Sequence, residues 1–401
     1  MKNTAALSAQ IPDKITEILD EIIAIRRDFH AHPELSGQEE RTAAKVSEYL
    51  TAWGIPHETG VAGHGIVGLI GSKGSHTVAL RADMDALPIQ EMNDIPYRSL
   101  NSGVMHACGH DIHTAVLLGA AKILKSMENE LPGRVKLLFQ PAEETVGGAE
   151  SMIQAGCLEN PKVDAVLGLH VEPRVLAGAV EFRRGAMNAA SDPFVITVKG
   201  VSSHGARPED GVDAVLAASQ IVCSLQSFVS RNIAAADAAV VTVGKFQAGT
   251  ASNIIASEAT LTGIIRTLDP AVRDRARKRV EEIACLTAQA YGAAATVEYV
   301  ESNPPLINDD DIETIMEETA AKMLSPEQIC FRPTCSMGAE DFAYFCEAVK
   351  STYYNIGTKT NPQDPTISLH NGHYCPDERC IRVGILMQCA GALSVLEHCG
   401  D

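Results

Sequence analysis

The nine residues Met105–His113 (MHACGHDIH) bring together one thiol, three imidazoles and one carboxylate. A single glycine separates Cys108 from His110, so an extended or tightly turned backbone lets the sulfur and the ring converge. Thiolate and imidazole suit borderline-soft ions such as zinc, and imidazole also binds nickel, cobalt and manganese. Asp111 follows directly and is a candidate to orient a ligand. The alternative is a histidine-rich helix start, capped by Asp111 and followed by the apolar run 115–124.

Upstream of this stretch, a predicted strand at 77–80 runs into the acidic segment 81–85 (RADMD). Open α/β sheets place their active sites beyond the carboxyl ends of strands. Asp83 and Asp85 are therefore candidates to support a metal site from outside its direct ligands. The alternative is a solvated strand end.

Downstream, two more apolar strands lead to residues of the types that can bind metals. The predicted strand 135–139 leads to Glu143 and Glu144, and the strand 163–169 ends at His170. Adjacent residues point in different directions, so one carboxylate can hold a metal while the other faces water. A surface Glu pair and a buried structural histidine are the alternatives.

The N-terminal region predicts two helices. Apolar residues recur at helical spacing over 13–29, and a second helix is expected from Ser36 to near Gly54. Ser36 and Glu39 have the spacing of a capping box, in which each side chain bonds the other residue's backbone N–H.

From about residue 188 the order of predicted elements is β-α-β-β-α-β, which matches a split ferredoxin-like unit. We expect an inserted domain over 188–304, between two parts of a first domain at 1–187 and 305–401. The insert carries His204, Asn253 and Arg266, which can together grip a carboxylate. Three unrelated surface groups are the alternative.

Bulk composition limits the class of protein. The chain has 401 residues, 45% of them hydrophobic, so it can form two or three folded domains. The net charge of −18 argues against nucleic acid and anionic membranes as partners. Eleven cysteines without a Cys-x-x-Cys motif, and no signal-like apolar run, predict a cytoplasmic protein.

Collected together, the ligand-type residues of the first domain predict an open, catalytic metal site. They are Cys108, His110, Glu144, His170 and His370. Ligands spread this widely fit a site open to substrate, and five exceed the needs of one structural ion. Glu143 is then placed as the general base, and His204 as a group that stabilises an oxyanion.

The sequence resembles the amidohydrolase branch of the aminoacylase and carboxypeptidase metallopeptidases, which includes hippurate hydrolases and hydrolases of auxin–amino acid conjugates. The resemblance covers nearly the whole chain. It is carried by the motifs 81–88 (RADMDALP), 105–111, 140–144 (QPAEE), 203–208 (SHGARP) and 251–253 (ASN). Where many members have a run of glycines after the Glu pair, this chain has Thr-Val-Gly-Gly.

The resemblance implies an α/β catalytic domain with a central mixed sheet flanked by helices, and an inserted ferredoxin-like lid and dimerisation domain. It implies two divalent ions per subunit, Mn²⁺ or Zn²⁺ with Ni²⁺ or Co²⁺ as further choices, held by the five ligands above. The expected reaction is hydrolysis of the amide bond of a small N-acyl-amino acid by a homodimer. A dipeptidase or carboxypeptidase with the same machinery is the alternative. A non-catalytic metal-binding protein is disfavoured, because binding alone needs no base at Glu143.

Overall fold

The computed structural model describes residues 4–145, 147–300 and 302–399. The chain divides into two compact units, which are described separately. Unit 1 consists of Met1–Gly185, Ile307–Thr334 and Tyr344–Asp401. Unit 2 consists of Ala186–Leu306 and Cys335–Ala343, so it also includes a short segment from beyond the expected insert. The catalytic and lid roles expected for these regions stay predictions.

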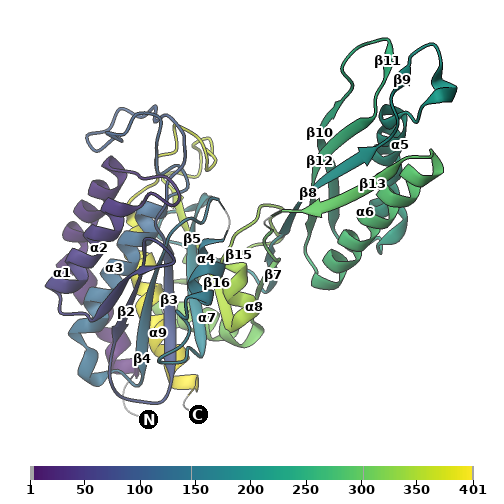
Figure 1. The fold of residues 1–401 in the computed structure, drawn as a ribbon. Helices are drawn as coiled ribbons and strands as arrows, with labels where there is room; N and C mark the ends of the chain where they lie inside the picture. The colour runs from purple at the N-terminus through teal and green to yellow at the C-terminus, as the bar shows by residue number, and fades with distance from the viewer. Residues whose placement is uncertain (1–3, 146, 301, 400–401) are drawn as a thin grey trace. The chain divides into compact units, whose positions relative to one another are not determined.

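Unit 1 is built on one mixed eight-stranded sheet (Figure 1). In spatial order its strands are β1 (His57–Val61), β2 (Gly65–Ile70), β4 (Arg134–Gln140), β3 (Thr77–Asp83), β5 (Ala165–Leu176), β16 (Lys350–Lys359), β6 (Val180–Phe182) and β15 (Ile329–Phe331). The four central strands, β4, β3, β5 and β16, are parallel to one another. β3, β4 and β16 are buried almost throughout and β5 is buried over its first half, as parallel strands covered on both faces are. The predicted α/β class with a central mixed sheet is confirmed.

Helices supply the rest of the core of unit 1. Those that the structure describes are α1 (Thr4–Ala31), α2 (Glu40–Ala52), α3 (His110–Ser126), α4 (Gly148–Gln154), α7 (Asp310–Met323), α8 (Ala343–Ala348) and α9 (Arg379–Cys399). α1, α3 and α9 pack against one another, and α3 and α9 also contact the sheet. α9 is the one described helix long and apolar enough to cross a membrane, but 83% of that stretch is buried inside the protein. Such burial is expected of a core helix.

Unit 2 contains a four-stranded antiparallel sheet and two helices. The sheet order is β10 (Ala239–Ala248), β12 (Glu258–Thr267), β8 (Ala190–Lys199) and β13 (Ala294–Tyr299), and the helices are α5 (Ala214–Ser227) and α6 (Pro270–Ala290). Phe194, Leu261 and Val280 belong to its separate hydrophobic core. The predicted β-α-β-β-α-β order is observed, with a two-stranded pair, β9 (Ser203–His204) and β11 (Ile254–Ile255), added to it.

The start of α2 differs from its prediction. The helix begins at Glu40, and neither Ser36 nor Glu39 caps it with its side chain. Instead, the carboxylate of Glu34 accepts hydrogen bonds from the backbone N–H groups of Arg41 and Thr42, at 2.9 and 2.8 Å. Because these first-turn amides already have a partner, the side chains of Ser36 and Glu39 are directed elsewhere. The predicted capping box is therefore wrong.

Candidate metal centre

Sheet register brings the acidic strand ends of unit 1 to one level. Asp83 at the end of β3 is paired with Gln140 at the end of β4, and Arg81 is paired with Gly168 in β5. His170 lies two residues beyond Gly168, level with Asp83. The loops after β3 and β4 therefore start beside the histidine on β5, as expected at the carboxyl edge of a parallel sheet.

The five predicted ligands of unit 1 form two overlapping groups. Cys108, His110 and His170 make one, and Cys108, Glu144 and His370 make the other, with the ligand-type atoms of each group within 4.8 Å of one another. Cys108 Sγ lies 3.4 Å from His170 Nε2, and His370 Nε2 lies 3.3 Å from Glu144 Oε1. Because Cys108 belongs to both groups, a thiolate at this position can bridge two ions.

Each candidate imidazole of α3 and β5 has one nitrogen fixed by a neighbour. His110 Nδ1 lies 3.2 Å from Asp85 Oδ1, which leaves Nε2 facing Glu144 at 3.9 Å. His170 Nδ1 donates to the backbone oxygen of Val171 at 2.8 Å, which leaves its Nε2 toward Cys108. Partners of this kind set the tautomer that presents a lone pair to a metal. Asp85 therefore contacts the candidate ligand His110 from outside the two ligand groups.

His113 is a residue whose role the sequence interpretation missed. It lies one helical turn from His110, and its ring centroid is 4.7 Å from that of His170. Its Nδ1 lies 2.6 Å from Asp83 Oδ1, and its Nε2 accepts the backbone N–H of Val171 at 3.0 Å. Both nitrogens are therefore occupied, so His113 supports the site instead of binding an ion. The signal was its i,i+3 spacing from His110.

Asp111 does not take the position expected of it. Its Oδ2 lies 2.7 Å from Arg26 Nε and 2.8 Å from His30 Nδ1, and all three side chains are buried. His30 Nε2 is in turn 3.2 Å from Glu91. Asp111 therefore ties the first turn of α3 to the end of α1, and these contacts connect it to no candidate ligand.

The electrostatics of the site favour a cation. Burial lowers the pKa of His110, but Asp83, Asp85 and Glu144 outweigh it and raise that pKa to about 10. Burial and the nearby Glu144 and Glu143 raise the pKa of the Cys108 thiol well above its usual value. A divalent ion satisfies both groups, because it neutralises the carboxylates and stabilises the thiolate.

The hydrogen bonding of two buried atoms shows whether the residues fit a metal. Among the described residues, His110 Nε2 and Glu144 Oε1 have no hydrogen-bond partner of good geometry. Buried polar atoms are normally satisfied, and both of these adjacent atoms carry a lone pair that can coordinate a cation directly, so they suit a metal. The set of one thiol, three imidazoles and one carboxylate suits Zn²⁺, Mn²⁺, Ni²⁺ or Co²⁺. The residues present therefore fit the expected ions.

The predicted carboxylate-binding residues lie in unit 2. β9 and β11 bring His204 and Asn253 together, with the Gly205 N–H donating to the Asn253 carbonyl at 2.7 Å. Arg266 is eight residues from Glu258, near the far end of β12, so roughly 26 Å of strand separates it from the β11 side. Within one copy of unit 2, the expected three-residue clamp does not form. Arg266 Nη1 is buried and has no hydrogen-bond partner among the described residues.

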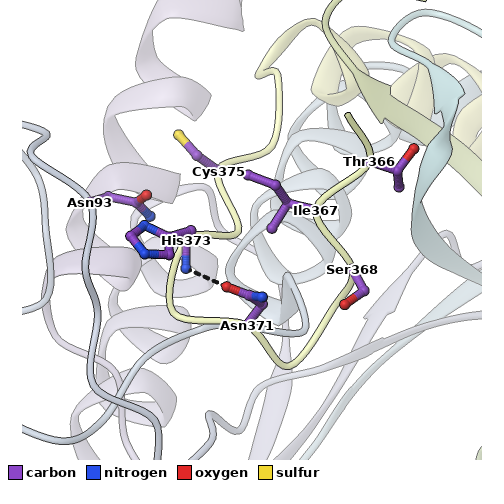
Figure 2. A pocket seen from close by; sticks show the side chains of 7 residues that line it. All are labelled: Asn93, Thr366, Ile367, Ser368, Asn371, His373 and Cys375. Carbon is purple, nitrogen blue, oxygen red and sulfur yellow. Dashed lines mark hydrogen bonds between the residues drawn. The ribbon is translucent and has the colours of Figure 1, made fainter. Parts of the chain in front are cut away.

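A hollow of about 550 Å³ opens in unit 1 beside the loop that carries His370 (Figure 2). Its walls come from two segments, and the lining residues are Asn93, Thr366, Ile367, Ser368, Asn371, His373 and Cys375. The His373 N–H donates to Asn371 Oδ1 at 2.9 Å (Figure 2), and Asn93 Nδ2 donates to the Tyr374 carbonyl at 3.1 Å. The lining residue Asn371 directly follows the candidate ligand His370 in the chain.

A metal-dependent amide hydrolase is the class that this fold and this site define. The model of peptidase family M20/M25/M40 matches residues 79–391, and the chain belongs to that family. The N-acetyl-L-cysteine deacetylase of Bacillus subtilis is 38% identical, over 86% of this chain and 82% of that protein. Thermostable carboxypeptidase 1 of Saccharolobus solfataricus is 36% identical, over 95% of this chain and 96% of that protein.

Among solved structures, a dinuclear metal-binding peptidase of the M20 family from Bacillus subtilis superposes with a TM-score of 0.83. It is 33% identical, and the match covers 95% of this chain and 99% of that one. The resemblance to amidohydrolases and carboxypeptidases inferred from the sequence motifs is thereby confirmed.

Proposed function

We propose that this protein hydrolyses the amide bond of N-acyl-amino acids, releasing a carboxylic acid and a free amino acid. The observation that carries the proposal is the pair of ligand groups sharing Cys108, with Glu143 next to the ligand Glu144. Likeness to a named deacetylase supports the same substrate class.

Each candidate site residue of unit 1 has a role in the proposed reaction. Cys108, His110, Glu144, His170 and His370 hold two divalent ions. Bound there, the ions polarise the scissile carbonyl and make water more acidic. Glu143 takes a proton from the attacking water and gives it to the leaving amine, so the C–N bond is replaced by a C–O bond with protons balanced. Asp85 keeps the ring of the ligand His110 oriented, and Asp83 keeps the ring of the supporting His113 oriented.

Replacing Glu143 by Gln tests the assignment of the base. The change removes a proton acceptor and retains the size of the side chain, so kcat should fall by about 10²–10⁴-fold. Metal content should stay at two ions per chain, measured by elemental analysis. Turnover at the wild-type rate would show that another group is the base.

The competing proposal is a dipeptidase or carboxypeptidase, which the 36% identity to a carboxypeptidase favours. Amine release should be measured with N-acetyl, N-benzoyl and long-chain N-acyl amino acids and with dipeptides, with and without Mn²⁺ or Zn²⁺. Turnover of N-acyl amino acids supports deacylation, and turnover of dipeptides alone supports the alternative. No metal-dependent turnover on either group would refute both proposals and leave the metal-binding alternative.

We further propose that the protein is a homodimer through unit 2. Because His204 pairs with β11, which precedes the start of β12, and Arg266 lies near the end of β12, a clamp that uses both fits two copies better than one. In such a dimer His204 and Asn253 of one protomer bind the substrate together with Arg266 of its partner. Light scattering after size-exclusion chromatography should give a mass near twice 42.7 kDa, and 42.7 kDa would contradict the dimer.

Replacing Arg266 by Ala tests the clamp itself. The guanidinium is expected to pair with the free carboxylate of the substrate, so KM for N-acyl amino acids should rise by about tenfold or more with a smaller change in kcat. The same substrates with an amidated carboxyl group serve as the control, because they lack the partner. An equal loss on both sets would remove Arg266 from substrate binding.

We propose Zn²⁺ or Mn²⁺ as the native ions, with Ni²⁺ and Co²⁺ as substitutes, and the cytoplasm as the compartment. All eleven cysteines carry free thiols, which supports a reducing environment. Turnover of protein reconstituted with each metal in turn tests the first point. Fractionation of the source cells tests the second.

A further inference from the structure

The segment before α2 reaches into the loop that carries the two catalytic-site glutamates. Glu39 is fully buried, and its Oε1 accepts hydrogen bonds from the backbone N–H groups of Gly37 and Ala142, both at 2.9 Å. Ser36 Oγ donates to Asp85 Oδ2 at 2.6 Å, and the same oxygen accepts the N–H of Glu144 at 2.9 Å. Two carboxylates thus hold the backbone on both sides of Glu143.

Ala142 needs such an anchor. Its φ of +56° is in the left-handed region, which costs an alanine free energy that a glycine would not lose. On the other side of the loop, a Cβ on Gly148 would lie 1.9 Å from the Pro141 oxygen, so the start of α4 packs tightly there. A strained turn persists only where its surroundings determine it. The Glu39 carboxylate supplies that constraint at the strained residue itself.

Stability does not explain the presence of Glu39. No lysine, arginine or histidine is among the main groups that shift its pKa in the described residues, and its Oε2 has no hydrogen-bond partner there. Burial, with the nearby Asp85, raises the pKa of Glu39 against the hydrogen bonds that lower it. A buried carboxyl without a counter-ion costs folding free energy, so its value to the protein must lie in geometry.

We propose that Glu39 is a positioning residue whose hydrogen bond to the Ala142 N–H holds the left-handed turn that aims Glu143 at the attacking water. Asp85, oriented by Ser36, fixes the amide of Glu144 on the other side of Glu143. The inference rests on the proposed hydrolytic function, because it assigns Glu39 a part in that reaction. Glu39 acts through Glu143 and touches neither substrate nor ion.

Three variants separate this role from general stability. Glu39→Ala removes the acceptor, and Glu39→Gln keeps an oxygen that can accept both N–H groups. Glu313→Ala is the matched control, because Glu313 is a fully buried carboxyl of the same unit that accepts the backbone N–H of Arg183 at 3.0 Å. Measurements are kcat, KM, metal content, and hydrogen–deuterium exchange of peptides covering Ala142, the last with and without metal.

We expect Glu39→Ala to lower kcat by about 10–100-fold, as a base displaced by about 1 Å does, with KM changed less than about threefold. Metal content should stay at two ions per chain, and the Ala142 amide should exchange faster in both metal states. Glu39→Gln should restore most of kcat and the protection of that amide. Glu313→Ala should keep kcat.

Wild-type kcat in Glu39→Ala would overturn the inference, as would equal losses of kcat in Glu39→Ala and Glu313→Ala. An equal loss of kcat in Glu39→Gln and Glu39→Ala would also overturn the inference. The negative charge of Glu39, and not its hydrogen bond, would then be what matters. If the wild-type protein hydrolyses no amide, the proposed function fails. In that case the exchange of Ala142 still reports whether Glu39 holds the turn.

Discussion

At the scale of single residues, the role of each imidazole depends on the partner of its second nitrogen. His110 and His170 each keep one nitrogen toward the candidate metal centre, whereas His113, between Asp83 and Val171, keeps none. The sequence predicted that this stretch binds metal, because thiol and imidazoles at short spacing are readable without a fold. It could not separate the roles of His113 and Asp111, because their partners come from distant strands and helices.

Glu313 provides a prediction about stability and pH. Burial raises its pKa to about 7 from 4.5, although Thr352 and the Arg183 amide donate to it. The folded state therefore holds its proton more tightly than the unfolded state. The resulting penalty is absent below pH 4.5, grows as pH rises, and is complete above about pH 7, where it reaches roughly 3 kcal/mol.

Glu313→Gln should therefore be more stable than the wild type at pH 8, because the amide carries no charge to bury. The advantage should shrink toward pH 5. Urea denaturation at several pH values measures it, and a difference independent of pH would contradict the assignment.

At the scale of elements, long apolar strands were predictable and short polar ones were not. β3 and β4 were expected within three residues of their observed bounds, whereas β5 runs seven residues beyond its predicted end. The five-residue β1, with sequence HETGV, has no strand-like apolar pattern. The start of α2 was misread for a related reason. A capping box is a local pattern, and here the tertiary partners Asp85 and Ala142 took the side chains that a local pattern would use.

The turn into α3 depends on Gly109, and Gly109→Ala tests this. Gly109 has a φ of +85°, and a Cβ there would lie 2.6 Å from Val171 Cγ2. Strain and overlap together should destabilise the protein by about 2–4 kcal/mol and weaken metal binding. Chemical denaturation and competition with a chelator measure the two effects.

Gly156→Ala is the control for this prediction. Gly156 also has a positive φ, of +86°, but its Cβ would meet no atom within 4 Å. The substitution Gly156→Ala should lower the free energy of unfolding by about 1–2 kcal/mol and leave metal affinity unchanged. Equal effects of the two variants on metal affinity would show that the overlap with Val171 does not matter.

At the scale of the whole molecule, the two units have separate hydrophobic cores, and all five candidate ligands lie in unit 1. The order of elements in unit 2 was predictable, because turns and apolar periods alternate clearly. The inclusion of residues 335–343 in that unit was not, because no local signal marks a return of the chain. Nor could the sequence show that Arg266, near the end of β12, lies far from His204, because the pairing of β9 with β11 has no local signal.

Removal of metal should affect the two units differently. Without ions, the acidic groups around His110 repel one another, so calorimetry should show the transition of unit 1 shifting down by several degrees after chelation. A transition of unit 2 should stay in place. Activity should vanish with the metal and return with Mn²⁺ or Zn²⁺; full activity in metal-free protein would refute the metal centre.

The position of β16 inside the sheet has a consequence for synthesis of the chain. β16 pairs with β5, and α9 belongs to the core of unit 1, so residues 350–399 complete the middle of a sheet begun before residue 60. The four-stranded sheet of unit 2 is complete at Tyr299. On the ribosome, unit 2 can therefore fold while β5 still waits with an open edge, which is prone to aggregation. His370 is the last of the five candidate ligands along the chain, so a newly made chain acquires its complete set of ligands only after β16 has also been made.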